Sequence, residues 1–263
     1  ISVLFGRTLA RQAAQVLALT AGNILEIGPG SGRLAFDLLS ELEQSGQLPE
    51  RYFLLEVSAD LRQRQQQLLA RFAPRVEWLD RLPAAFSGLI LGNEVLDAMP
   101  VDLVAWGEDS LFERGVSMAG GEFSWSERTL TSGELFDIAA SLSFTRHSRN
   151  QKKNHQTPSF PRRRASIVRS HNGMDSRLRG NDGEESYVSE IGLAARGFAA
   201  TLAGLLEKGV ILMLDYGFGQ SEYYHPQRSS GTLMCHYRHY AHDDPFYLPG
   251  LQDITSHVDF SAI

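Results

Sequence analysis

Cysteine is nearly absent from this sequence, and long apolar runs are absent altogether. Among 263 residues there is a single cysteine, Cys235, which excludes a disulfide within one chain and a zinc site built on several cysteines. No apolar stretch approaches the roughly 20 residues of a transmembrane helix, so we expect no membrane span. Apolar residues still make up 43% of the chain, which suits one large domain with or without an appendage.

The chain also lacks an initiator methionine and a signal-like region, because it begins at Ile1. We therefore expect a fragment of a longer protein whose last part is truncated. A single cysteine is compatible with a reducing compartment, and we expect a cytoplasmic location in a bacterium.

Charge is distributed unevenly along the chain. Residues 145–185 hold ten Lys or Arg and four Asp or Glu, whereas the remainder carries a net charge of −12. Segment 144–186 has few large apolar residues and predicts a disordered basic insertion. Parts of it, at 159–164 and 174–183, resemble translated dispersed repeats of bacterial genomes. Phe160 stands alone there, so no aromatic residues interleave with the charges to stack on bases, and we expect no specific nucleic-acid partner.

The most informative stretch joins a short apolar run to a glycine turn. The run Ile24–Ile27 is followed by Gly28, Gly30 and Gly32, and residues 34–39 then have helical spacing. This order of strand, tight turn and helix is typical of the first unit of a nucleotide-binding α/β domain. Glycine permits the backbone angles of such a turn and lets a ligand approach the main chain.

The spacing of the glycines indicates which ligand is bound. A dinucleotide fingerprint has a third glycine where this chain has Arg33. An acid two residues before the first glycine, Glu26, would repel a pyrophosphate but suits the ammonium and sulfonium groups of S-adenosylmethionine. We predict that the cofactor contacts Glu26, Gly28, Gly30 and Gly32, with a turn that binds no ligand as the alternative.

Two further acids lie at the ends of predicted strands. The second strand, residues 52–57, contains Glu56 near its carboxyl end, where an acid can accept hydrogen bonds from both ribose hydroxyls. A third strand, residues 76–79, is followed by Asp80, which could accept from an adenine amino group. The alternative for Glu56 is a surface acid at a strand end, and the alternative for Asp80 is a simple loop aspartate.

Helices are expected between these strands. Ser58 is a favourable N-cap for a helix that extends to about Phe72, and the polar residues 62–67, Gln65 among them, would form its solvated face. Further helices are predicted over residues 2–19, from the glycine turn to about residue 43, over 133–142, and over 190–208.

Residues 88–100 contain another buried strand, which ends at Asn93 and Glu94 and is broken at Pro100. Ligands of doubly wound sheets bind outside the carboxyl ends of the strands, so these side chains and Asp97 would face the reacting groups. We predict Asn93, Glu94 and Asp97 as catalytic residues, with Asn93 also at the cofactor. Helix capping is the alternative for Asp97.

The next predicted strands follow one another without helices between them. Residues 101–106, 113–118 and 122–125 read as strands, and Gly120 and Gly121 form a hairpin turn. They predict an antiparallel appendage, about residues 101–127, that could cover the site.

A later buried strand, residues 210–214, ends in Asp215, Tyr216 and Gly217. Asp215 therefore joins the predicted catalytic residues. The region beyond is irregular and holds histidines at 236, 239, 242 and 257. Their spacings match no standard metal motif, so we expect loop histidines and no metal.

Taken together, these motifs resemble the MidA family of class I S-adenosylmethionine-dependent methyltransferases. Its mitochondrial branch is an assembly factor of respiratory complex I. The resemblance covers nearly the whole chain except the insertion, and it is carried by five motifs: Glu26–Gly32, Gly92–Glu94 with Asp97–Val101, Asp215–Gly217, Gly231–Leu233 and Asp253–Phe260.

The resemblance implies an α/β fold with a doubly wound, mostly parallel, Rossmann-like sheet. Residues 1–143 would form the first part of the methyltransferase domain and residues 187–263 its continuation, separated by the insertion 144–186. The eukaryotic branch is associated with methylation of an arginine of a partner protein, so a protein substrate is expected here. The oligomeric state stays open, with a homodimer among the options.

An arginine acceptor requires carboxylates that hold its planar guanidinium. Glu94 is the first choice for that role, and the acidic body of the chain suits a cationic acceptor. The residues predicted to bind the substrate are Glu190, Tyr216, Asp253, His257 and Asp259. A non-catalytic assembly or binding protein that keeps the cofactor pocket is one alternative. A nicotinamide oxidoreductase is the other, and Arg33 disfavours it.

Overall fold

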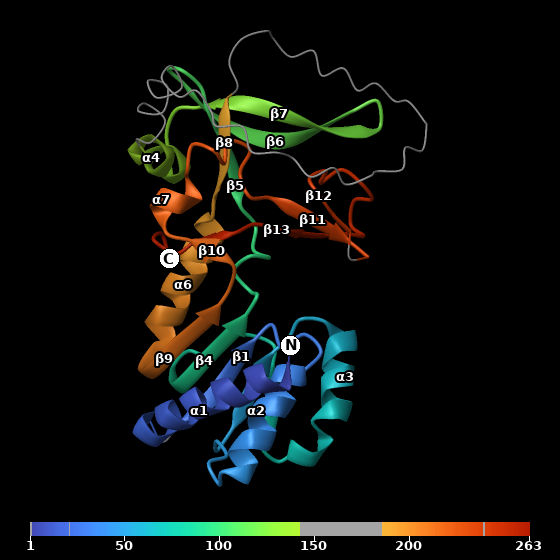
Figure 1. The fold of residues 1–263 in the computed structure, drawn as a ribbon, viewed down its shortest axis with the longest axis vertical. Helices are drawn as coiled ribbons and strands as arrows, with labels where there is room; N and C mark the ends of the chain where they lie inside the picture. Colours follow the sequence, from blue (N-terminus) through green and yellow to red (C-terminus); the bar gives the residue numbers. More distant parts are fainter. Residues whose placement is uncertain (1, 21, 143–185, 239) are drawn as a thin grey trace, which may run out of the picture. The chain divides into compact units, whose positions relative to one another are not determined.

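The computed structural model describes residues 2–20, 22–142, 186–238 and 240–263, and the chain divides into two compact units (Figure 1). The first unit comprises Ile1–Asp102, Glu190–Tyr223 and Thr232–Ile263, and the second comprises Leu103–Ser189 and Tyr224–Gly231. The predicted insertion, 144–186, lies outside the described residues except for its last one.

A five-stranded parallel sheet forms the centre of the first unit. Its strand order is β3-β2-β1-β4-β9, and each neighbouring pair is parallel. The strands are β1 (Asn23–Ile27), β2 (Tyr52–Leu55), β3 (Val76–Leu79), β4 (Phe86–Asn93) and β9 (Leu206–Leu214). This arrangement confirms the predicted parallel sheet.

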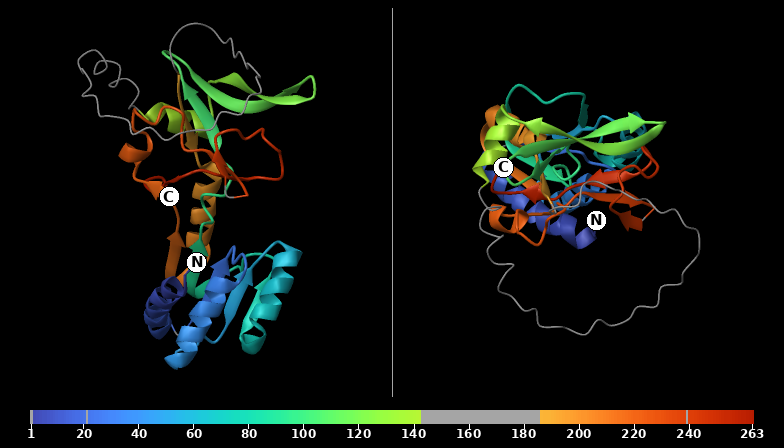
Figure 2. Two further views of the ribbon diagram at one scale, coloured as in Figure 1. Left: turned by 45° about the vertical axis from the view of Figure 1, so that its right-hand side comes forward. Right: turned by 90° about the horizontal axis from the view of Figure 1, so that it is seen from above.

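Helices cover both faces of this sheet. Because successive strand residues point to opposite faces, Ile24 packs with α1 (Val3–Thr20) and α2 (Arg33–Gln44), whereas Leu25 packs with α6 (Leu193–Leu205). Helices α1 and α2 lie side by side in both Figure 1 and Figure 2. The sheet is therefore doubly wound, as the sequence predicts.

Helix α3 (Ala59–Leu68) follows β2 and begins at its predicted cap, since the Ser58 hydroxyl accepts from the backbone N–H of Leu61. The prediction of a solvated face is wrong for Gln65, which is fully buried. Gln65 lies four residues before the buried Leu69, so both project from the same side of the helix toward the core.

Shorter elements complete the first unit. They are a 3-10 turn, η1 (Ala70–Phe72), the helix α7 (Gln220–Tyr223), the parallel pair β10 (Gly217–Phe218) and β14 (Val258–Asp259), and the antiparallel sheet of β11 (Met234–Tyr237) between β12 (Tyr240–His242) and β13 (Asp253–Thr255). In the parts of the chain that the structure describes, no helix is long and apolar enough to cross a membrane.

The second unit is built on an antiparallel sheet, which confirms the predicted antiparallel strands. The order is β7-β6-β5-β8, and the long green hairpin of Figure 1 turns at Gly120 and Gly121, both with positive φ. Its elements are β5 (Asp102–Trp106), β6 (Leu111–Ala119), β7 (Glu122–Leu130), β8 (Tyr187–Ile191) and α4 (Glu134–Ser141). The first residue of β5 and the last two residues of β8 belong to the first unit.

The predicted helix over residues 190–208 is wrong at both ends. Glu190 belongs to β8, and α6 begins only after Gly192. Beyond α6 the chain turns directly into β9, which pairs with β4 from Leu206 onward. Pairing with a neighbouring strand overrides the helical spacing of these residues, because strand formation depends on tertiary context.

Two glycines allow β1, β4 and β9 to approach one another closely. A Cβ atom on Gly209 would lie 1.8 Å from the carbonyl oxygen of Gly88, and one on Gly88 would lie 2.0 Å from that of Asn23. Both glycines also have positive φ, +145° and +137°. A side chain at either position would push paired strands apart.

We therefore predict that Gly209→Ala lowers the free energy of unfolding by about 1–3 kcal/mol, the usual cost of overpacking. Gly204→Ala is the matched control, since it lies in α6 and its added methyl group meets no atom within 4 Å. It should keep or slightly raise stability, because alanine favours a helix. Urea denaturation measures the free energy of unfolding of the two variants. Equal stabilities would contradict the strand packing described here.

Candidate functional site

The parallel register brings several of the predicted site residues to one edge of the first unit's sheet. Ile27 is in register with both Leu55 and Gly92, and Asn93 is in register with Leu214. The glycine turn, Glu56, the Asn93–Asp97 segment and Asp215 each follow one of these strand ends. They therefore meet although they lie far apart in the sequence.

The glycine turn presents bare main chain at this edge. Gly28, Gly30 and Gly32 all have positive φ, between +53° and +76°, where other residues are strained. A Cβ atom on Gly30 would meet nothing within 4 Å, so this side of the turn is open. Gly32 caps α2 without a side-chain hydrogen bond, which leaves the first N–H groups of the helix for a ligand. Both features fit a cofactor that lies against the main chain.

Glu26 lies in β1 just before the turn and is almost completely buried. Its Oε2 accepts a hydrogen bond of 2.7 Å from the Tyr52 hydroxyl, and burial raises the pKa of Glu26 to about 7. The side chain is therefore neutral below that pH, while a cation beside it would favour ionisation. Its contact with a positively charged cofactor stays a prediction, and no pattern in the sequence indicated its tyrosine partner.

Glu56 follows β2 and is held by two donors. Its Oε1 accepts from the Ser58 N–H at 2.8 Å, and its Oε2 accepts from Gln65 Nε2 at 3.1 Å. Each carboxylate oxygen has a second lone pair, so ribose hydroxyls could still bind. The ribose contact itself stays a prediction.

Asp80 follows β3, but its side chain is 87% exposed and pairs with Arg62 at 2.8 Å. Arg62 also donates to the carbonyl oxygens of Glu56 and Leu79 and so ties the ends of β2 and β3 together. The predicted adenine contact of Asp80 is not tested by this geometry.

Glu94 follows β4 and adopts an unusual backbone conformation, with φ at +53°. Its N–H donates to the carbonyl oxygen of Leu214 at 2.8 Å, and its Oε1 accepts from the Tyr216 hydroxyl at 2.9 Å. Backbone strain of this kind is concentrated at functional sites. The end of β9 therefore fixes both the main chain and the carboxylate of Glu94.

The carboxylate of Asp215 is hydrogen-bonded to backbone N–H groups of the protein. Its Oδ2 accepts from the backbone N–H groups of Val95, Leu96 and Asp97 at 3.1, 2.8 and 3.3 Å, and its Oδ1 accepts from the Tyr216 N–H. These bonds cap the turn that follows Glu94. The geometry favours a positioning role for Asp215 over the predicted direct catalytic role.

Asp97 is 7% exposed, and its Oδ1 has no hydrogen-bond partner among the residues that the structure describes. Burial, followed by the charges of Asp215, Glu94 and Asp253, raises its pKa to about 6. We name these four side chains, Asp97, Asp215, Glu94 and Asp253, the acidic cluster. Within the described ranges no Lys or Arg forms an ion pair with any of them, and no group of side chains there could hold a metal ion.

Glu190, predicted to contact the substrate, is 1% exposed and accepts several internal hydrogen bonds. Its Oε1 accepts from the N–H groups of Thr232 and Leu233 at 2.7 and 2.8 Å, and its Oε2 accepts from the hydroxyls of Thr232 and Tyr223. Glu190 thus holds the Gly231–Leu233 motif in place. This geometry favours a structural role.

The remaining predicted substrate residues are arranged around that motif and the last strand. The Thr232 hydroxyl accepts from the His257 N–H at 3.0 Å, and the His257 ring packs on Phe218. Asp259 accepts from the Ser261 N–H, and burial raises the pKa of its carboxyl group. Of this set, Asp253 is a member of the acidic cluster, and the Tyr216 hydroxyl donates to Glu94 of the same cluster. Substrate contact by any of them stays a prediction.

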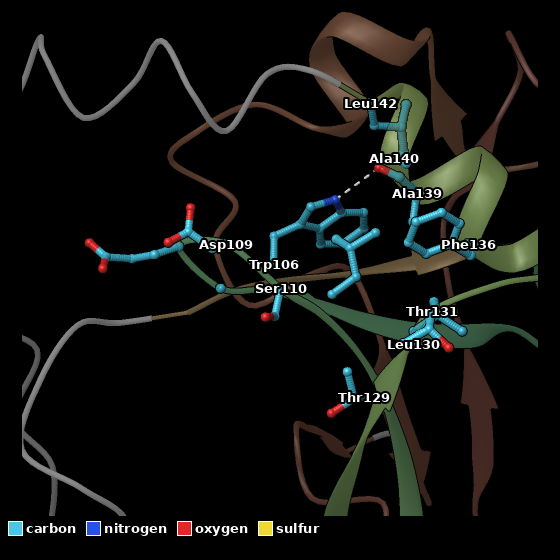
Figure 3. Close-up of a pocket in the computed structure, with 13 residues that line it drawn as sticks. Trp106, Asp109, Ser110, Thr129, Leu130, Thr131, Phe136, Ala139, Ala140 and Leu142 are labelled. Carbon is cyan, nitrogen blue, oxygen red and sulfur yellow. Dashed lines mark hydrogen bonds between the residues drawn. The ribbon is translucent and has the colours of Figure 1, made fainter.

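The second unit contains a separate cavity of about 570 Å³ (Figure 3). It is lined by residues of β5–β7 and α4, and the Trp106 indole donates to the carbonyl oxygen of Ala139 at 3.1 Å. None of the residues predicted to bind cofactor or substrate belongs to it.

The open face of the turn yields a first prediction for this site. Gly30→Ala should weaken binding of S-adenosylhomocysteine about tenfold or more, because the methyl group would occupy the space of the ligand. Gly46→Ala is the matched control: Gly46 also has positive φ and an empty Cβ position, but it lies beyond the end of α2. Calorimetry measures both affinities, and similar losses in the two variants would contradict a cofactor at Gly30.

The buried Glu26 predicts a dependence of stability on pH. Between its ordinary pKa of 4.5 and about 7 the folded chain retains a proton that the unfolded chain has released. Stability should therefore fall with rising pH, by up to about 1.4 kcal/mol per pH unit. Glu26→Gln removes this contribution, so its stability relative to the parent should increase from about pH 5 to about pH 8 in ligand-free denaturation. A constant difference would show that Glu26 is ionised in the folded chain.

Solved structures of known proteins share this fold. A crystal structure of a Burkholderia thailandensis protein bound to S-adenosyl-homocysteine superposes with a TM-score of 0.78 at 40% identity, covering 99% of this chain and 59% of that one. A second structure from the same organism gives 0.75 at 41%, covering 98% and 60%. The Drosophila melanogaster "Protein arginine methyltransferase NDUFAF7 homolog, mitochondrial" is 27% identical over 267 residues. That match covers 91% of this chain and 51% of the fly protein, so the chain spans about half to three-fifths of these relatives.

A family model described as "Putative S-adenosyl-L-methionine-dependent methyltransferase" matches residues 8–263, which is nearly the whole chain. The match confirms the resemblance predicted from the five motifs, and the family's cofactor is the one that the glycine turn indicates. The chain belongs to this family of S-adenosylmethionine-dependent methyltransferases.

Proposed function

We propose that this protein transfers the methyl group of S-adenosylmethionine to an arginine side chain of a partner protein. The observation that carries the proposal is the acidic cluster. Glu94 and Asp97 follow the end of β4, Asp215 follows the end of β9, and Asp253 begins β13. The side chain of Val95 lies 3.4 Å from the Cβ position of Gly28. The cluster therefore borders the glycine turn, where the cofactor is predicted to bind.

The electrostatics of the cluster favour a cationic acceptor. Burial, followed by the charges of three neighbouring carboxylates, raises the pKa of Asp97, and its buried Oδ1 is unpartnered among the described residues. A guanidinium would supply both the missing charge and the missing hydrogen-bond donors, because it is planar and carries five N–H groups. The fly relative, named as a protein arginine methyltransferase, agrees with this choice.

The geometry gives the acids different tasks. Asp215 fixes the backbone of Val95 to Asp97, and the Tyr216 hydroxyl orients Glu94. Glu94 and Asp97 would then hold the guanidinium so that one nitrogen faces the methyl carbon. The new N–C bond forms as the C–S bond breaks, the electron pair passes to sulfur, and the nitrogen releases one proton, which a carboxylate of the cluster can accept.

The test is transfer of isotopically labelled methyl groups into a protein extract from bacteria that lack this protein. Acid hydrolysis of the product should release labelled methylarginine. Glu94→Gln should slow the transfer about tenfold or more, since it loses a charge-assisted hydrogen bond, while the affinity for S-adenosylhomocysteine stays unchanged. The matched control is Glu50→Gln, an exposed acid of the first unit, which should transfer like the parent.

Two results would overturn the proposal. Label in another amino acid or in a small molecule would identify a different acceptor. Normal binding of S-adenosylhomocysteine without any transfer would favour a non-catalytic assembly or binding protein.

A further inference from the structure

Gln65 joins three elements at the predicted cofactor edge of the sheet. It is completely buried in α3. Its Nε2 donates to the carbonyl oxygen of Gly30 at 2.7 Å and to Glu56 Oε2 at 3.1 Å, and its Oε1 accepts from Trp78 Nε1 at 2.9 Å. One side chain thus connects the glycine turn, the acid after β2 and the strand β3.

The chemistry of these partners fixes the orientation of the amide. The indole N–H of Trp78 can only donate, so the atom that faces it must be the amide oxygen. Both amide N–H groups then point at acceptors, Gly30 and Glu56. A flipped amide would set donor against donor and acceptor against acceptor. A buried network in which every group is satisfied in this way is rigid.

Gln65 also supports the turn sterically. A Cβ atom on Gly32 would lie 3.0 Å from Gln65 Cγ, whereas one on Gly30 would meet nothing within 4 Å. The glutamine therefore packs against the turn at Gly32 and leaves the space at Gly30 open. Any shift of Gln65 would move the main chain of the turn and the carboxylate of Glu56 together.

We propose that Gln65 is a positioning residue for the cofactor, which holds the Gly30 carbonyl and the Glu56 carboxylate in the arrangement that binds the adenosyl group. Preorganised contacts bind more tightly because their ordering cost is met during folding. The proposal rests on the predicted roles of the glycine turn and Glu56. It does not depend on the identity of the methyl acceptor.

The first test replaces the amide by an apolar chain of the same length. Gln65→Met removes both donors, and S-adenosylhomocysteine should bind about tenfold more weakly or worse by calorimetry. Gln66→Met is the matched control, since it makes the same change at an exposed position of the same helix and should bind like the parent.

A second measurement separates positioning from a general loss of structure. An S-adenosylhomocysteine analogue that lacks the ribose 2′-hydroxyl should bind the parent more weakly than S-adenosylhomocysteine itself. If Gln65 orients Glu56, Gln65→Met should bring the ratio of the two affinities close to one, as Glu56→Ala should. Mere loosening of the fold would weaken both ligands and preserve the ratio.

Each outcome has one meaning. If the ratio of the two affinities falls to about one in Glu56→Ala but stays as in the parent in Gln65→Met, Glu56 binds the ribose without the help of Gln65. That result overturns the role of Gln65. A parental ratio in Glu56→Ala shows that Glu56 does not bind the ribose, and the proposal fails with it. If Gln65→Met does not fold, Trp78→Phe supplies the same test, because it removes the N–H that orients the amide and keeps an aromatic ring at this position. An unchanged ratio there overturns the proposal.

Discussion

Parallel pairing of β1 with β4, and of β4 with β9, is the constraint on which the first unit depends. It sets Ile27 beside Gly92 and Asn93 beside Leu214, so the chain leaves three strands at the same edge. The glycine turn, the segment after Asn93 and Asp215 meet only for this reason. Close approach of the strands requires glycine at 88 and 209, where a side chain would collide with neighbouring backbone. A change far from the edge can therefore disturb the site.

The candidate site residues fall into two groups according to their hydrogen bonds. Asp215, Glu190 and Gln65 are bonded mainly to groups of the protein itself, and each holds a backbone segment in place. Asp97 Oδ1 has no hydrogen-bond partner among the described residues, and the space beside Gly30 is open. The first group gives the site its shape, and the second marks where ligands can bind. This division also explains why acids that look equivalent in sequence should respond differently to substitution.

Local patterns were sufficient to predict the sheet, the glycine turn and the positions of acids at strand ends. They were insufficient where a partner is distant in sequence. Gln65 stands among polar neighbours, and only its spacing to Leu69 hints at burial. Glu190 lies in a stretch with helical spacing, but it belongs to β8, which pairs with β5, and its side chain accepts from Thr232, 42 residues away. The protonation of Glu26 likewise depends on its burial in the folded chain, which raises its pKa, while the hydrogen bond from Tyr52 in the next strand lowers it. Each of these features arises from tertiary contacts that periodicity does not encode.

The most direct measurement is a crystal structure of this chain with S-adenosylhomocysteine. The account predicts that the ligand lies over Gly28 to Gly32, with both ribose hydroxyls within hydrogen-bond distance of the Glu56 carboxylate and Gln65 still bonded to Gly30. A ligand bound away from the glycine turn, or a ribose held without Glu56, would contradict it.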